Sequence, residues 1–244
     1  MIYLLGDVHG QFHHILPALQ KTRAQDGVQT VIFLGDIEAQ KPFEEEIAPL
    51  LDAGVDVWFI PGNHDTDSHT AWANLLPSWH RNLDGRVVTI EGLRIAGLGG
   101  VFRGEIWHPD IGKKFNSFAD FEASRHFNKT PHLAGRLLKH SSTIWPAVYD
   151  AMSLLSADVL VTHEAPSCHH NGFGVLDDLG RAMGIKALFH GHHHKHMNYQ
   201  AFDDALGFRA HGVGFRGITD VHGGLLLTGK YDEGAGTGSD SAEI

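Results

Sequence analysis

Five short apolar runs, each ending at an Asp, Asn or His, constrain the fold of this 244-residue chain more than any other feature. Each run has the length and the content of β-branched, aliphatic and aromatic residues expected of a strand buried on both faces. In open α/β sheets, ligands bind beyond the carboxyl ends of the strands. If the five strands are neighbours, their polar groups meet at one sheet edge and form a metal site. The runs are residues 2–5, 31–34, 57–60, 159–162 and 187–190.

Helical patterns separate the first three runs. Apolar residues recur at helical spacing in residues 12–19, which predicts a crossover helix between the first two strands. Residues 42–51 have three acidic residues near the start, and Gly54 lies just beyond their end, so we expect a second helix there. Strands that alternate with helices in this way are typical of a parallel sheet.

The pattern changes after residue 86. Residues 86–90 and 93–98 predict a β-hairpin around a tight Glu91–Gly92 turn, and a second sheet or an antiparallel edge begins there. The C-terminal part, at residues 197–202, 208–213 and 225–227, has further short strands with Gly-rich turns. We therefore expect an α/β fold of two mixed sheets packed face to face with helices outside, with one large sheet as the alternative.

Composition narrows the class of protein. A hydrophobic content of 42% with 20% charged residues is typical of a soluble globular chain, and no stretch is long and apolar enough to span a membrane. The net charge of -10 disfavours a non-specific nucleic-acid binder, which needs Lys and Arg to neutralise phosphates. Cys168 is the single cysteine, so no intrachain disulfide forms, and no signal peptide is recognised. We expect a cytoplasmic protein.

Residues 101–156 lack the strand-to-ligand pattern and resemble a helical, cap-like insertion within a single domain of residues 1–231. Within 101–140, seven Lys or Arg against four Asp or Glu give a net charge of +3 (7 minus 4). This segment is either a helical excursion with a solvated face or a cap that offers positive charge to an anionic substrate. The Gly-, Ser- and acid-rich tail, residues 232–244, is expected to be flexible.

The polar groups that follow the five runs have the chemistry of metal ligands. The chain has 20 His against 19 Lys plus Arg, and neutral imidazole is the commonest protein metal ligand. Carboxylate, amide and imidazole together suit manganese, zinc or iron. Seven such groups are too many for one tetrahedral site, so two ions about 3.5–4 Å apart that share a carboxylate are expected. The seven are Asp7, His9, Asp36, Asn63, His163, His192 and His194.

These residues resemble the calcineurin-like metallophosphoesterase superfamily, whose pattern is D-x-H, G-D, G-N-H-D/E, H and G-H-x-H. All five blocks occur in family order, at residues 7–9, 35–36, 62–65, 163 and 191–194. Any single block is a weak indication, but the ordered set, each block after an apolar run, is a strong one. The resemblance implies a four-layer α-β-β-α sandwich of two mixed sheets flanked by helices.

The resemblance also implies roles for individual residues. Asp7, His9 and His194 would hold one metal ion, Asp36 would bridge, and Asn63, His163 and His192 would hold the second. His64 would lie near the leaving oxygen and either act as general acid or stabilise developing charge there. It further implies two divalent or mixed-valence ions (Mn, Fe or Zn, with Mn favoured) and in-line attack by a hydroxide that bridges them.

One departure from the family concerns the second block. The opening Gly6–Gly10 resembles the serine/threonine protein phosphatases and the symmetrical diadenosine tetraphosphatases, whose second block reads G-D-x-V-D-R-G. Here Ala39 stands in place of the carboxylate and Gln40 in place of the phosphate-clamping arginine. We expect Asp65 or Glu38 to replace the carboxylate as the partner of His64, and Arg103 to replace the clamp.

Three function classes follow. The first is a metal-dependent hydrolase of phosphate mono- or diesters of a small soluble substrate, with nucleotides among the candidates. The second is a catalytically silent, metal-stabilised interaction module, against which the presence of His64 argues. The third is a nuclease, which the acidic charge disfavours. Cys168 and the remaining histidines are read as ordinary structural residues, and the sequence leaves the oligomeric state open.

Overall fold

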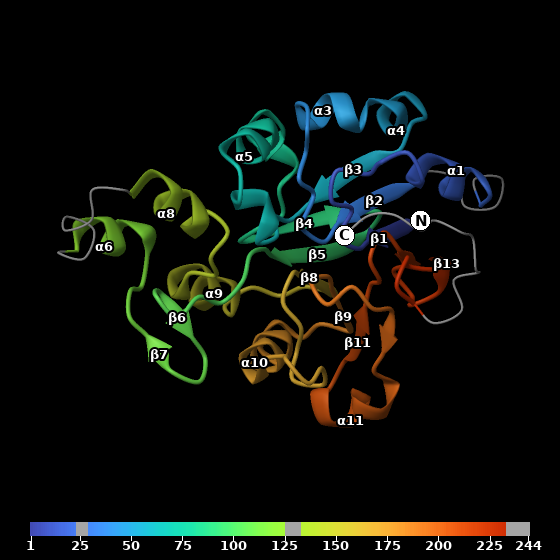
Figure 1. The fold of residues 1–244 in the computed structure, drawn as a ribbon. Coiled ribbons are helices and arrows are strands. Elements are labelled where there is room, and N and C mark those ends of the chain that lie inside the picture. The colour runs from blue at the N-terminus through green and yellow to red at the C-terminus, as the bar shows by residue number, and fades with distance from the viewer. Residues whose placement is uncertain (23–28, 125–132, 233–244) are drawn as a thin grey trace.

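The computed structural model describes residues 1–22, 29–124 and 133–232, and only the backbone of 133–136. Two mixed sheets form the centre of the described part (Figure 1). In spatial order the first contains β13 (Leu225–Leu227), β12 (Ile218–Asp220), β1 (Ile2–Leu5), β2 (Thr30–Phe33) and β3 (Asp56–Phe59). The second contains β10 (Met197–Asn198), β11 (Arg209–Gly212), β9 (Ala187–His190), β8 (Val159–Thr162), β5 (Leu93–Leu98) and β4 (Arg86–Ile90). A small ribbon pairs β6 (Trp107–His108) with β7 (Gly112–Lys113).

The helices lie outside the two sheets. On the side of the first sheet are α1 (Ile15–Gln20), α3 (Phe43–Glu46), α4 (Ala48–Asp52) and α5 (His69–Leu75). Nearer the second sheet are α6 (Phe118–Ala123), α8 (Leu133–His140), α9 (Pro146–Met152), α10 (Gly174–Met183) and α11 (Asp203–Leu206). Three 3₁₀ turns complete the list: η1 (His64–Thr66), η2 (Leu76–Arg81) and η3 (Gln200–Phe202). No helix in the described ranges has the length and apolar character to cross a lipid bilayer.

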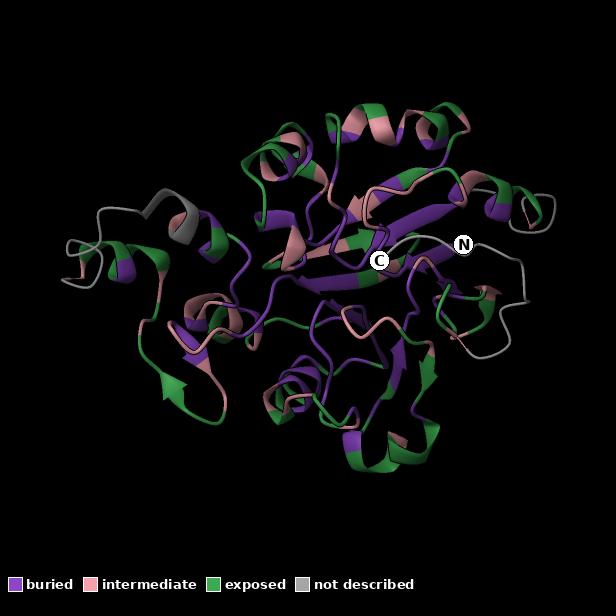
Figure 2. Ribbon diagram, viewed as in Figure 1, coloured by how far each residue is buried: buried purple, intermediate pink, exposed green. Residues whose placement is uncertain are grey.

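Alternating side chains of the central strands fill three separate cores. In β1, Leu4 packs between the two sheets, whereas Leu5 packs under the first layer of helices. In β9, Phe189 packs between the sheets, whereas Leu188 packs against the second helical layer. Three cores separate four layers, and the strands are buried along their length while the outer helices expose one face (Figure 2). The predicted α/β fold of two mixed sheets flanked by helices is confirmed.

The five apolar runs all form strands, but they do not share one sheet. β1, β2 and β3 lie side by side and parallel in the first sheet, and β8 and β9 lie side by side and parallel in the second. The carboxyl ends of both sets therefore meet where the two sheets pack together. The expectation of one sheet edge was wrong, because the inner core holds the two sheets face to face.

One predicted element differs in detail, one is confirmed and one strand was not predicted. The helix expected over 42–51 is broken into α3 and α4 at Ile47, because Pro49 has no N–H to donate to the preceding turn. The hairpin over 86–98 is confirmed as β4 and β5. The strand β12 was not predicted. It pairs antiparallel with β1 and brings the C-terminal part of the chain back to the first sheet.

The segment 101–156 shares a core with the second sheet. Phe102, Trp107 and Met152 are buried in the cluster that also contains Leu160 of β8. The single-domain boundaries stay a prediction. The side chains of three of the seven Lys and Arg residues in the net-positive segment 101–140 lie outside the described residues. Asp232, the first residue of the expected tail, accepts hydrogen bonds from the N–H groups of His196 and Gly229, each at 2.7 Å. Residues 233–244 lie outside the described residues.

We predict that His211 limits stability in acid. It is 4% exposed and stacks on Phe189, and no described residue forms a hydrogen bond with either ring nitrogen. Burial, with smaller contributions from Arg209 and His196, lowers the pKa of His211 to about 4. Protonation therefore favours the unfolded chain, so stability is full above pH ~6.5 and is lost as pH falls toward 4.

In His211→Leu, the loss of unfolding free energy between pH 7 and pH 5 should be smaller by roughly 2 kcal/mol, as measured by urea denaturation. The exposed His222 supplies the control His222→Leu, in which the loss should match that of the wild type. An equal loss in His211→Leu and wild type would contradict the assignment.

Candidate metal centre

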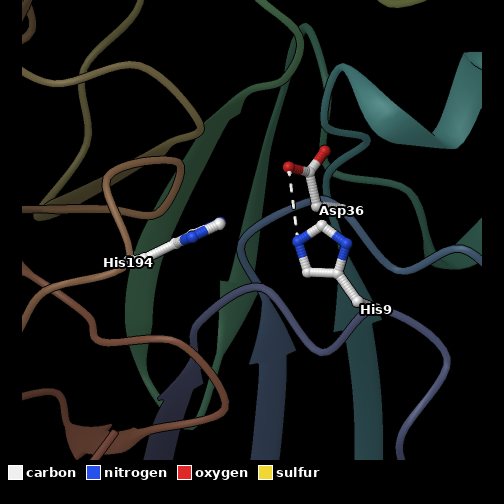
Figure 3. Close-up of side chains that lie close together, drawn as sticks. All are labelled: His9, Asp36 and His194. Atoms are coloured by element: carbon white, nitrogen blue, oxygen red, sulfur yellow. Dashed lines mark ion pairs between the residues drawn. The ribbon is translucent and has the colours of Figure 1, made fainter. Parts of the chain in front are cut away.

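The loops that follow β1, β2, β3, β8 and β9 bring their polar side chains together between the two sheets. Figure 3 shows this convergence for His9, Asp36 and His194, which come from three different loops and point toward one another. One ligand atom from each of these three lies within 4.8 Å of the others. The His9 Nε2 to Asp36 Oδ2 distance is 3.9 Å. They form the first potential metal group.

A second group consists of Asp36, His163 and His192, again with ligand atoms within 4.8 Å of one another. His163 Nε2 lies 3.4 Å from Asp36 Oδ2 and 3.0 Å from the amide oxygen of Asn63. Asp36 thus belongs to both groups, as a bridging carboxylate must. Asn63 lies beside the second group, on the side where the resemblance placed it.

Asp7 lies between the two groups. Its Oδ2 is 3.6 Å from His194 Nε2 in the first group, and its Oδ1 is 3.7 Å from His163 Nδ1 in the second. All seven predicted ligands therefore lie at one place, although they come from positions 7 to 194 of the chain. Their individual metal assignments stay predictions.

Several of the ligand atoms lack a hydrogen-bond partner among the described residues and are suited to bind a cation instead. Both carboxylate oxygens of Asp7, Oδ2 of Asp36 and Nε2 of His9 are buried without a hydrogen-bond partner in the described part of the chain. An unpaired buried carboxylate oxygen is costly, and a divalent cation removes that cost. Nitrogen and oxygen donors in this mixture suit manganese, iron or zinc.

Close backbone packing at glycines permits the convergence. A Cβ on Gly62 would lie 2.2 Å from Asp36 Oδ1, and a Cβ on Gly35, whose φ is +99°, would lie 2.4 Å from His163 Nδ1. Any side chain at these positions would displace the two residues that the second group needs.

Several site residues have a left-handed backbone conformation. The φ angles are 43° at His9, 48° at Asp36, 67° at His192 and 60° at His194. This region costs a non-glycine residue roughly 1–2 kcal/mol. Such strain persists only when the surrounding structure imposes it, and it concentrates at functional sites.

Neighbouring groups fix the orientation of two imidazoles. His9 Nδ1 donates to Glu38 Oε1 at 2.8 Å, which leaves Nε2 facing Asp36. His163 Nδ1 donates to the carbonyl oxygen of Leu34 at 2.7 Å, which leaves Nε2 facing the second group. Metal-ligating histidines are commonly held in this way, through the nitrogen that does not bind the metal.

His64 lies beside the first group, with its ring centroid 5.4 Å from that of His9. Its Nδ1 donates to Asp67 Oδ2 at 2.7 Å, which leaves Nε2 available to a substrate. The expectation that Asp65 orients His64 was wrong, because both Asp65 oxygens accept backbone N–H groups, from Glu38 and Gly62. Glu38, the other candidate, lies 3.8 Å from His64 Nδ1 and bonds to His9 instead.

Sequence reasoning missed three residues at the site. Asp67 was recognisable only as a carboxylate three positions after His64. Glu164, adjacent to His163, is 5% exposed, and its Oε2 lies 4.0 Å from His192 Nε2. Phe215 gave no sequence signal; its ring lies 5.1 Å from His9 and 4.8 Å from His194 and forms an apolar wall over the first group.

Arg103 is hydrogen-bonded to the segment between α8 and α9. Its Nη1 donates to the Ser142 carbonyl oxygen at 2.5 Å and to Thr143 Oγ1 at 3.1 Å. Burial lowers the pKa of Arg103, and the carboxylates of Asp67, Glu164 and Asp36, among others, act in the opposite direction. Its role as a phosphate clamp stays a prediction.

Burial raises the pKa of the Cys168 thiol to about 12, which makes it a poor nucleophile.

Comparison with known proteins identifies the family. The family model for calcineurin-like phosphoesterases matches residues 1–196, which include all five motif blocks. The chain belongs to the calcineurin-like phosphoesterase family. An uncharacterised protein of Haemophilus influenzae is 39% identical over 233 residues, which cover 93% of this chain and 96% of that protein.

A solved structure agrees with the fold of this calcineurin-like phosphoesterase. The protein TT1561 of Thermus thermophilus superposes with a TM-score of 0.51 at 14% identity, over 90% of this chain and 94% of that one. A protein serine/threonine phosphatase of Saccharomyces cerevisiae, similar to human phosphatase PP5, gives a TM-score of 0.38 at 17% identity, over 89% of this chain and 71% of that one. That second value is too low to support an argument.

The charges of this phosphoesterase site are interdependent when no metal is bound. Burial raises the pKa of Asp7 to about 6, although His163 partly opposes this. Burial alone would lower the pKa of His163, but the facing carboxylates of Asp36 and Asp7 outweigh it and raise that pKa to about 10. In protein free of metal, the carboxylates of Asp36 and Asp7 therefore favour the protonated form of His163.

We predict that metal binding releases this proton. Calorimetric titration of metal-free protein with Mn²⁺ at pH 8 should release the His163 proton, because a ligating imidazole must lose it, together with any proton that a metal-bound water loses. The apparent enthalpy should therefore change with the ionisation enthalpy of the buffer, and the apparent affinity should rise with pH. Identical enthalpies in buffers of low and high ionisation enthalpy would contradict a protonated His163.

Proposed function

We propose that this phosphoesterase-family protein is a dinuclear-metal-dependent hydrolase of phosphate mono- or diesters of a small substrate. The observation that carries the proposal is the pair of potential metal groups that share Asp36. The first group lies next to the imidazole of His64, which is oriented by a carboxylate and whose Nε2 has no hydrogen-bond partner among the described residues.

The first group would hold one ion through His9 and His194, the second would hold another through His163, His192 and Asn63, and Asp36 would bridge. Asp7, which lies between the two groups, would be a ligand of the first ion. We favour manganese for this donor set. Two bound ions would supply Lewis-acid stabilisation of the phosphoryl oxygens and would lower the pKa of a bound water toward neutrality.

His64 would protonate the leaving oxygen. Donation from Nδ1 to Asp67 places the second proton of an imidazolium on Nε2, which is the nitrogen left for the substrate. Asp67 would hold the ring in position and stabilise its positive charge. Glu38, whose Oε1 lies 2.8 Å from His9 Nδ1, would likewise hold the His9 ring in position as a metal ligand.

The candidate substrates are small phosphate esters, including nucleotides. The net charge of -10 disfavours a nuclease, since nucleic acid would be repelled. A silent interaction module on the same fold would have no need of a carboxylate-oriented imidazole beside the ligands. The His64–Asp67 pair therefore favours turnover over simple metal-stabilised binding. We also expect the protein to be cytoplasmic.

The central prediction concerns His64. In protein reconstituted with Mn²⁺, His64→Ala should lower kcat by about 10²–10⁴-fold, the usual contribution of a general acid, while bound metal stays unchanged. The assay compares a generic phosphomonoester, a phosphodiester, a nucleotide panel and single-stranded DNA. His80→Ala is the matched control, because His80 is an exposed histidine on η2.

Three outcomes separate the function classes. Hydrolysis of small esters by wild type, and its loss in His64→Ala, supports the proposal. Wild-type activity no greater than that of His64→Ala on every substrate would leave only the interaction module. Faster cleavage of single-stranded DNA than of any small ester would favour the nuclease.

Arg103 gives a second prediction. If its guanidinium contacts the substrate phosphate, Arg103→Ala should raise KM about tenfold or more, because a charge-assisted hydrogen bond contributes about 1.5–3 kcal/mol. Arg103→Lys keeps the charge and should recover part of that loss. Unchanged KM and kcat in Arg103→Ala, with normal thermal stability, would remove Arg103 from the substrate site.

A further inference from the structure

A pocket of about 260 Å³ opens beside His64, and neither His163 nor His192 of the second metal group is among its lining residues. One wall is the turn that follows β2, and the other is the segment that runs from η1 into α5. Its volume is below the 300–1,000 Å³ of pockets for drug-sized ligands, so it suits a group about as large as one sugar ring. The polar residues that line it are Glu38, Gln40, His64, Asp67, Ser68 and Thr70.

The charge of this pocket is negative. Glu38 and Asp67 contribute two carboxylates, and no Lys or Arg is among the lining residues, all of which belong to the described chain. Gln40 occupies the position where the related phosphatases carry an arginine. A second phosphate placed in this pocket would face two carboxylates, at a cost of about 1 kcal/mol for each charge pair even in high dielectric. Among the lining residues the one potential cation is the His64 imidazolium, which is already paired with Asp67.

The remaining lining groups are neutral hydrogen-bonding groups. Ser68 Oγ accepts the N–H groups of Thr70 and Ala71, which leaves its own O–H free to donate. The Gln40 side-chain amide donates to the Glu38 carbonyl oxygen at 3.0 Å, so it is held against this wall. Hydroxyl groups of a ligand can both donate to and accept from such a lining.

We infer that this pocket binds the leaving alcohol of the substrate. It selects an uncharged, polyhydroxylated alcohol about as large as one sugar ring, and it discriminates against a leaving group that carries its own phosphate. The inference rests on the proposed function, since it needs His64 at the leaving oxygen. Hydrolysis breaks the bond from phosphorus to the ester oxygen, and water supplies the new oxygen on phosphorus. The proton from His64 Nε2 completes the alcohol in the pocket.

The test uses two substrates that differ by one phosphate. Initial rates of phosphate release are measured for fructose 6-phosphate and fructose 1,6-bisphosphate with the Mn²⁺-loaded protein, and p-nitrophenyl phosphate reports general phosphoesterase activity. Two unfavourable charge pairs predict that kcat/KM is at least about tenfold higher for the monophosphate.

Three variants separate the charge of the pocket from its size. Gln40→Lys adds a cation to the pocket and should lower the preference for the monophosphate about tenfold, whereas Gln40→Met, of similar length and neutral, should retain it. Gln200→Lys adds the same charge at an exposed position of η3, near α11, on the opposite side of the molecule from α5 (Figure 1). It should not change the preference, which excludes an effect of net charge alone.

The outcomes distinguish this inference from the proposed function. If metal-loaded wild type leaves p-nitrophenyl phosphate, both sugar phosphates, the phosphodiester and the nucleotide panel all intact, the proposed function fails. If p-nitrophenyl phosphate is hydrolysed but the bisphosphate is used as well as the monophosphate, or neither sugar ester is used, the pocket assignment alone is overturned. Equal preferences in Gln40→Lys and Gln40→Met would also overturn it.

Discussion

Two carboxylates buried between the sheets, those of Asp7 and Asp36, impose the main constraint on this structure. Both residues are 0% exposed, and removing two like charges from water is costly unless cations compensate them. Three of their oxygens lack any hydrogen-bond partner among the described residues. The His163 imidazole faces both carboxylates, which raise its pKa.

The four-layer framework makes this costly arrangement possible. The inner core holds β1 and β2 against β8 and β9, so loops from both sheets are fixed at short distances. Gly35 and Gly62 allow the backbones to approach, and the left-handed conformations at His9, Asp36, His192 and His194 direct their side chains inward. Packing of the cores, rather than contacts within the loops, offsets the local strain.

Charge is distributed unevenly around the centre. The Arg103 guanidinium is held by Ser142 and Thr143 and interacts electrostatically with Asp67 and Glu164, whereas Glu38 and Asp67 line the pocket beside His64. Phe215 covers the first group with an apolar ring. This polarity is consistent with a substrate whose phosphate lies at the ions and whose uncharged part lies beyond His64.

The sequence by itself determined the five buried strands, the order of the metal-ligand blocks and the α/β class, because apolar runs and the polar residues that end them are local properties. Tertiary structure alone decided that the strands divide between two sheets, and that β12 returns to pair with β1. It also decided that Asp65 binds backbone N–H groups, that Glu38 binds His9, and that Asp67 is left to orient His64. Those choices depend on how segments distant in the chain pack together, and no local pattern encodes that packing.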